Sequence, residues 1–262
     1  MTDHTTIFRA TMLATLICCS LPAALAASLR AAPAGQAAPS GSDQDERSRS
    51  DDTGRSVSAT SRSAHNAAQR VSAALDVVPR LAAEPRIKPL LQQAKGLLIV
   101  PSFGRVALGL GAHGGAGVLL LRKSDGSWSG PAFYNVGGLS LGVQAGAEGG
   151  AMALVLNNDK AVEEFMKKNN FALSAEAGLT VLNWSRLAQG SAGTGDVVAW
   201  SGTRGLFGDA VNVGLSDIRY NQELTNAYYG RTLAPHDIAQ GNVTNTQAQP
   251  LQQALAQAAA AN

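Results

Sequence analysis

Hydrophobic positions along this chain follow two different periods, and the change between them predicts the fold. Apolar residues recur at helical spacing over residues 64–78, and residues 158–168 form a capped pattern with acids early and lysines late. Between residues 96 and 156, short apolar runs alternate with glycines, which indicates β-strands and turns. More strands are expected over residues 171–215, followed by a last polar helix over residues 218–229. This order predicts an α+β fold.

The distribution of glycine refines the expected sheet. Residues 104–150 hold 14 of the 28 glycines, several of them inside apolar runs. Glycine within a strand usually marks a bulge, tight curvature or close backbone approach. Residues 124–127 have the composition of a hairpin turn. We therefore expect a curved, largely antiparallel β-sheet or barrel-like core with flanking helices.

The first 26 residues have the pattern of a secretory signal peptide. A short polar start precedes an apolar run, and Ala24-Leu25-Ala26 is an A-x-A cleavage site. Pro22 interrupts a run that is already short for a bilayer. Lipid modification at Cys18 or Cys19 is disfavoured, because neither cysteine follows a small residue. We expect cleavage at this site and export to the periplasm. Association of the exported protein with a membrane is a second form of this prediction.

The rest of the chain divides by composition into a linker, a domain and a tail. Residues 27–63 combine alanine, serine, proline, glycine and mixed charges with almost no large apolar residue. Such a segment cannot bury enough surface to offset its chain entropy, so we predict a disordered linker. Residues 64–241 form the expected folded domain, and residues 242–262 form a glutamine- and alanine-rich tail that we predict to be flexible.

Charge and composition exclude several functional classes. The 21 basic and 19 acidic residues give a net charge of +2, which argues against a globally basic nucleic-acid binder. Both cysteines lie in the predicted signal peptide, so we expect no disulfide in the exported chain. The remaining histidines, His65, His113 and His236, share no metal-ligand spacing. We expect neither a metal nor a cofactor.

Two glycine motifs resemble active-site signatures. Residues 109–114 match G-x-G-x-x-G, but strand-like residues follow where a dinucleotide site needs a helix. Residues 138–142 match the G-x-S-x-G nucleophile elbow, and Ser140 with His236 would supply the nucleophile and base of a serine esterase. The chain lacks the repeated β-then-α pattern of that fold. We predict that the protein is not an enzyme and keep the esterase as an alternative.

Cations and an aromatic residue concentrate in one part of this nearly neutral chain. Between Arg86 and Pro131, six basic residues accompany a single acid, Asp125. Cations beside amphipathic aromatic residues suit an anionic bilayer surface or lipid head groups. The first helix and its end add two arginines to this set. The predicted lipid-binding residues are Arg70, Arg80, Arg86, Lys88, Lys95, Arg122, Lys123 and Trp128.

Short segments between Val71 and Gly230 occur in the order found in a known family. They are residues 87–97 with an intact Ala-Lys-Gly, 115–119, Trp128, 131–134, 137–138, 142–146, Ser201, 205–207 and 226–230. In these segments the chain resembles the SYLF domain family of lipid-binding proteins, which is related to the actin-binding domain of yeast actin-patch proteins. The resemblance implies a non-enzymatic module that binds phospholipid through basic residues and an N-terminal amphipathic helix, here residues 64–78.

The sequence therefore predicts one function and leaves two alternatives open. The predicted function is a non-enzymatic lipid-binding protein of the bacterial cell envelope, which binds anionic head groups or the membrane surface. Its expected partner is phospholipid, and no nucleic-acid partner is expected for an exported chain. One alternative is the serine esterase that uses Ser140 and His236. The other is a structural envelope protein that binds a protein partner.

Overall fold

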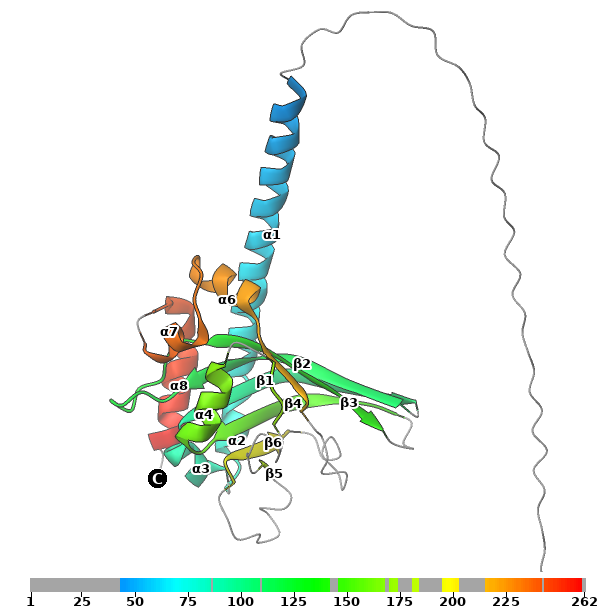
Figure 1. The fold of residues 1–262 in the computed structure, drawn as a ribbon. Helices are drawn as coiled ribbons and strands as arrows, with labels where there is room; N and C mark the ends of the chain where they lie inside the picture. Colours follow the sequence, from blue (N-terminus) through cyan, green and yellow to red (C-terminus); the bar gives the residue numbers. More distant parts are fainter. Residues whose placement is uncertain are drawn as a thin grey trace, which may run out of the picture. The chain divides into compact units, whose positions relative to one another are not determined.

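The computed structural model describes residues 43–85, 87–108, 110–141, 146–167, 170–173, 181–183, 195–202, 215–241 and 243–260. The chain divides into two units, Met1–Asp45 and Glu46–Asn262, and the second contains the sheet shown in Figure 1. The strands are β1 (Gly96–Leu108), β2 (Leu110–Leu121), β3 (Ala132–Leu141), β4 (Gly146–Leu156), β5 (Val181–Asn183), β6 (Val197–Ser201) and β7 (Asp217–Tyr220). The helices are α1 (Asp43–Leu75), α2 (Val78–Ala82), α3 (Lys88–Gln93), α4 (Asp159–Met166), α6 (Gln222–Tyr229), α7 (Pro235–Ala239), the 3₁₀ turn η1 (Thr246–Ala248) and α8 (Gln249–Ala260).

The seven strands form one sheet in the order β5-β6-β4-β1-β2-β3-β7. All neighbours are antiparallel except β5 and β6, which are parallel. Within the described residues the sheet is open, because β5 and β7 each have a strand neighbour on one side only. The prediction of an α+β fold with a largely antiparallel sheet and flanking helices is confirmed, in its open rather than its barrel-like form.

The central strands are buried on both faces, which explains their continuous apolar runs. Leu97 and Ile99 of β1 belong to one core cluster, whereas Leu98 and Val100 belong to the other. Successive side chains of a strand point to opposite faces, so a run without polar residues fills two cores at once. The first core also contains residues of α1, α2, α3, α6 and α8. The second contains residues of α4 and α7.

A bulge in β1 accounts for two of the glycines in β2. The ladders of β1 with β2 and with β4 both shift their register just before Phe103. A Cβ atom on Gly117 would lie 2.5 Å from the carbonyl oxygen of Ile99, and one on Gly115 would lie 2.6 Å from that of Ser102. The backbone of the bulged strand therefore occupies the space that side chains would need.

Two predicted helices are found, with ends set by specific residues. The side chain of Asn158 accepts a hydrogen bond of 3.0 Å from the amide of Ala161 and thereby caps α4. Helix α6 ends at Gly230, which has φ of 68° in the left-handed region. This helix starts at Gln222 rather than at Ile218 as predicted, because Ile218 pairs with Val136 as part of β7.

Both ends of the domain differ from the sequence expectation. Helix α1 begins at Asp43, inside the segment 27–63 that we predicted to be a disordered linker. Helix α8 lies in the predicted flexible tail, yet Leu251 and Leu255 are 0% and 1% exposed in the first core. The physical reason is an apolar stripe at positions i, i+4 and i+7 that α8 buries against α2 and α3. The signal peptide predicted for residues 1–26 lies outside the described residues and stays a prediction.

Among the helices that the structure describes, none is long and apolar enough to cross a membrane.

Candidate functional site

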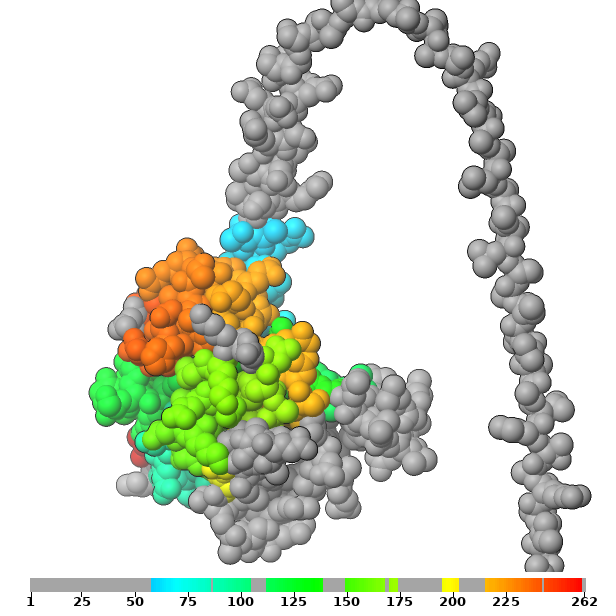
Figure 2. Space-filling view, in the orientation of Figure 1, coloured from blue at the N-terminus to red at the C-terminus, as the bar shows by residue number. Residues whose placement is uncertain are grey.

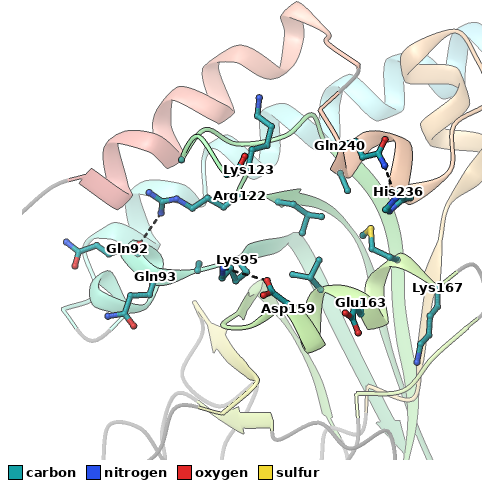
Figure 3. A pocket seen from close by; sticks show the side chains of 17 residues that line it. Gln92, Gln93, Lys95, Arg122, Lys123, Asp159, Glu163, Lys167, His236 and Gln240 are labelled. Atoms are coloured by element: carbon teal, nitrogen blue, oxygen red, sulfur yellow. Dashed lines mark hydrogen bonds and ion pairs between the residues drawn. The ribbon is translucent and has the colours of Figure 1, made fainter.

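An open groove lies where four segments meet: the junction of α3 and β1, the end of β2 with its hairpin, α4 and α7 (Figure 3). Its volume is about 930 Å³. In Figure 2, the yellow-green surface of α4 adjoins the orange surface of α6 and α7. We call this site the charged groove, and its charged and polar lining is Gln92, Gln93, Lys95, Arg122, Lys123, Ser124, Asp159, Glu163, Lys167, His236 and Gln240.

The charged groove combines an apolar inner wall with an excess of positive charge. Leu121, Val162 and Met166 line it and belong to the second core or pack against it. Four cations and two carboxylates line the same space. An amphipathic ligand with a negative group therefore finds complementary chemistry here, because apolar contact and cations are offered side by side.

Two lysines of the charged groove make long ion pairs. The Nζ atom of Lys95 lies 3.7 Å from Oδ1 of Asp159, across the gap between the α3–β1 junction and α4. The Nζ atom of Lys123 lies 3.8 Å from Oδ2 of Asp125, whose pKa is lowered by hydrogen bonds from Ser127. Both lysine side chains remain partly exposed, at 51% and 32%. Such pairs are weak in water, so an incoming anion can compete for either lysine.

Arg122 has a structural task in addition to its charge. Its Nη1 atom donates hydrogen bonds of 3.3 and 3.1 Å to the carbonyl oxygens of Leu91 and Gln92, at the end of α3. Carbonyls in the last turn of a helix have no partner within that helix, so the arginine satisfies them. Its guanidinium also lies 5.7 Å from the ring centroid of Trp128. Arg122 therefore fixes α3 as one wall of the charged groove.

Trp128 is a core residue rather than a surface aromatic. It is 3% exposed and belongs to the first core cluster. Gln252 of α8 donates a hydrogen bond of 3.1 Å to its carbonyl oxygen. Trp128 is among the lipid-binding residues predicted from the sequence, whereas the structure buries its side chain in the first core. Its link to the charged groove is the contact between its ring and the guanidinium of Arg122.

The other cations predicted from the sequence do not line the charged groove. Arg80 donates a hydrogen bond of 2.9 Å from Nη2 to the carbonyl oxygen of Gly202, which ties α2 to the end of β6. Arg70 lies partly buried on α1, and Lys88 is the first residue of α3. Arg86 lies outside the described residues. The structure thus brings Lys95, Arg122 and Lys123 together, and the lipid-binding role of all eight residues stays a prediction.

The apolar face of the predicted membrane helix is already occupied. Ala67, Val71 and Ala74 of α1 are 0 to 3% exposed and belong to the first core. A helix that inserts into a bilayer needs this face free. In this conformation, contact with lipid would have to use other parts of the molecule.

Several residues of the charged groove were not among the predicted lipid-binding residues, although His236 was predicted as the base of the alternative esterase. Glu163 and Lys167 come from α4 and the residue after it, and His236 and Gln240 come from α7 and the residue after it. The side chains of His236 and Gln240 lie 2.8 Å apart. All four lie far along the chain from Gln92, so no local motif connects them. The excess of lysine at the end of α4 was the sole available signal.

Ser140 and His236, the proposed esterase pair, lie far apart along the strands of the sheet. Ser140 of β3 pairs with Gly111 of β2, whereas His236 lines the charged groove together with Leu121, ten residues further along β2. Ten residues of strand span roughly 33 Å, far beyond hydrogen-bond reach. Ser140 also continues into Leu141 as strand, whereas a nucleophile elbow turns into a helix there. The pair therefore cannot act as a nucleophile and its base.

The other signatures give no chemical site within the described residues. Of the segment 109–114, residues 110–114 form part of strand β2, so no helix N-terminus follows the glycines. No group of three or more histidine, cysteine, aspartate or glutamate side chains in the described part of the chain is placed to hold a metal ion.

A comparison with protein-family models gives a match for residues 137–258. The family is described as "Ysc84: Las17-binding protein actin regulator". The matched region begins in β3, ends in α8 and includes α4 and α7, which form one side of the charged groove. This match, with the relatives described next, confirms the relationship to the SYLF domain family that the sequence predicted.

Known proteins are similar over about three fifths of the chain. It is 30% identical over 170 residues to "SH3 domain-containing YSC84-like protein 1" of Bos taurus, which covers 63% of this chain and 49% of the relative. It is 30% identical over 159 residues to "Protein YSC84" of Saccharomyces cerevisiae, covering 59% and 34%. It is 28% identical to "LAS seventeen-binding protein 3" of that yeast, with the same coverage. The chain thus spans half or less of each of these relatives.

No solved structure matches the chain. The family description and the name of the third relative refer to binding and regulation rather than to a reaction.

Proposed function

We propose that this protein is a non-enzymatic lipid-binding protein of the bacterial cell envelope, and that the charged groove receives the phosphate-bearing head group of a lipid. The observation that carries the proposal is the charged groove itself. Its lysines converge from segments far apart in the sequence and stand beside the apolar inner wall formed by Leu121, Val162 and Met166.

The chemistry of the lining supports a lipid rather than a freely soluble anion. Lys95 and Lys123 offer ammonium groups that are only weakly paired, so they can bind a phosphate. A small inorganic ion buries no apolar surface against this wall, whereas the glycerol and first methylene groups of a lipid can pack against it. Because α1 uses its apolar face in the core, the proposed contact relies on the charged groove instead of that helix.

Vesicle flotation of the full chain tests this proposal. We expect co-flotation with vesicles of phosphatidylglycerol in phosphatidylcholine, weakened by high salt, since salt screens exposed charges. The double variant Lys95→Glu and Lys123→Glu should lose most of this binding. The control is Arg231→Glu, a charge reversal at an exposed position outside the charged groove, which should bind nearly as wild type. Equal binding by both variants would refute a role for the charged groove.

A protein partner is the second candidate, and the family description and the name of one relative favour it. The family description and "LAS seventeen-binding protein 3" both refer to binding of another protein. A structural envelope protein that binds such a partner would use its surface without lipid. Affinity capture from the envelope of the producing cell, before and after lipid is removed with detergent, distinguishes lipid binding from protein binding. A partner that stays bound after the lipid is removed supports the protein-binding candidate.

The proposed location follows from the first 26 residues. A signal peptide that is cleaved after Ala26 would place the domain in the periplasm. Amino-terminal sequencing of the protein from a periplasmic fraction tests this. A chain that begins at Met1 in the cytosolic fraction would contradict export.

A further inference from the structure

One side of the charged groove holds two cations, whereas the other holds both carboxylates of the lining together with Lys167 (Figure 3). Arg122 and Lys123 lie on one side, Asp159 and Glu163 lie on α4 on the other, and Lys95 lies between them (Figure 3). The Asp159 side chain is 81% exposed, and its ion pair among the described residues is with Lys95. Glu163 is exposed and makes no ion pair with any residue that the structure describes.

Binding of a simple phosphate would leave the carboxylates of the charged groove on α4 without their paired cation. A phosphate that takes Lys95 removes the cation that is paired with Asp159. Asp159 and Glu163 are four residues apart on α4, so they are neighbours on the same helix surface. The nearby cations Lys160 and Lys167 form their ion pairs with Asp196 and Glu164. Without a paired cation, Asp159 and Glu163 repel each other, and both line the charged groove. A ligand that carries its own positive group would restore the balance.

We infer that the ligand of the charged groove is a zwitterionic lipid head group, a phosphodiester that bears a primary ammonium group as in phosphatidylethanolamine. This inference rests on the proposed function and adds the class of head group. The phosphate binds Lys95 and Lys123, and the ammonium binds Glu163 and the carboxylate that Lys95 releases. An ammonium donates hydrogen bonds to carboxylates, whereas the glycerol of phosphatidylglycerol offers only hydroxyl groups.

Soluble head groups test the inference without the electrostatic field of a charged membrane surface. The full chain is titrated with glycerophosphoethanolamine and with glycerophosphoglycerol, which share the phosphodiester and differ in the ammonium, and binding is followed by calorimetry or by NMR shifts. We expect the wild type to bind glycerophosphoethanolamine about fivefold more tightly, the size of one partly exposed ion pair.

Glu163→Gln should reduce this preference, and the double variant Asp159→Asn and Glu163→Gln should abolish it, because both carboxylates that bind the ammonium are then neutral. Glu223→Gln, the same exchange at an exposed position of α6 outside the charged groove, should keep the preference. Equal affinity of the wild type for both head groups, or a preference that survives the double variant Asp159→Asn and Glu163→Gln, would overturn the inference and leave lipid binding standing. If neither head group binds but vesicles still float with the protein, the inference also falls alone. If vesicles do not bind either, the proposed function falls with it.

Discussion

Replacing Leu255 by alanine tests whether the end of the chain belongs to the fold. Leu255 lies in α8, is 1% exposed and belongs to the first core. The substitution removes three carbon atoms, and each buried methylene contributes about 0.8 kcal/mol, which gives about 2.4 kcal/mol. The cavity that remains adds to this loss, so buried leucine-to-alanine changes cost about 2–5 kcal/mol. A terminal helix can shift to fill part of the space, so we expect a loss of about 2.5 kcal/mol, near the lower end of that range.

Urea unfolding measures this loss. The transition can be followed by tryptophan fluorescence, because Trp128 and Trp200 lie in the same core as Leu255. The matched control is Gln257→Ala, a nearby exposed position of α8 that should change the free energy of unfolding by less than about 0.5 kcal/mol. If Leu255→Ala were as stable as this control, α8 would not contribute to the core, and the sequence prediction of a flexible tail would be right.

Three further predictions concern groups elsewhere in the structure. Arg122→Lys keeps the charge but loses the planar fork that binds the end of α3, so urea unfolding should show a loss of about 1–2 kcal/mol, and unchanged stability would contradict the assigned role. Gly117→Ala should cost about 1–3 kcal/mol, because its Cβ would press on the bulge, whereas Gly104→Ala in β1 has open space around it and serves as the control. Burial raises the pKa of Tyr220 to about 12, and burial also raises the pKa of the other three tyrosines of the chain. The folded state therefore holds protons that the unfolded state releases near pH 10, so stability is full below about pH 10 and falls as the pH rises further. Tyrosinate absorbance should stay low at about pH 11 while the protein is folded, and early ionisation of all four tyrosines would contradict their burial.

The sheet could be predicted from the sequence because its signals are local. Residues 96–100 and 151–156 are apolar runs long enough to fill both faces of a strand. Asn158 and Gly230 mark the ends of helices through their own side-chain and backbone chemistry. Each of these signals depends on a few neighbouring residues, so a single sequence carries it.

Helix α8 and the charged groove depend on contacts that the sequence does not reveal. The apolar stripe of α8 is only two leucines and small alanines, which becomes a core contribution because α2 and α3 lie against it. Lys95 and Lys167 meet in one groove because β1 and β4 pair and α4 follows β4. For Trp128 the sequence pointed the wrong way. Its neighbouring cations in the sequence suggested an exposed side chain, whereas the fold buries it.

The bulge of β1 also selects one alignment of the strands over its neighbours. A shift of β2 by two residues keeps each side chain on its face, so the alternation of the core alone would tolerate it. Such a shift would bring Leu119 to the place of Gly117, where a Cβ atom meets the carbonyl of Ile99 at 2.5 Å. The shift in the opposite direction would bring His113 to the place of Gly115, where the carbonyl of Ser102 blocks it at 2.6 Å. The bulge and its two glycines thus fit each other in one alignment only, and misaligned hairpins are rejected during folding by collision with the backbone.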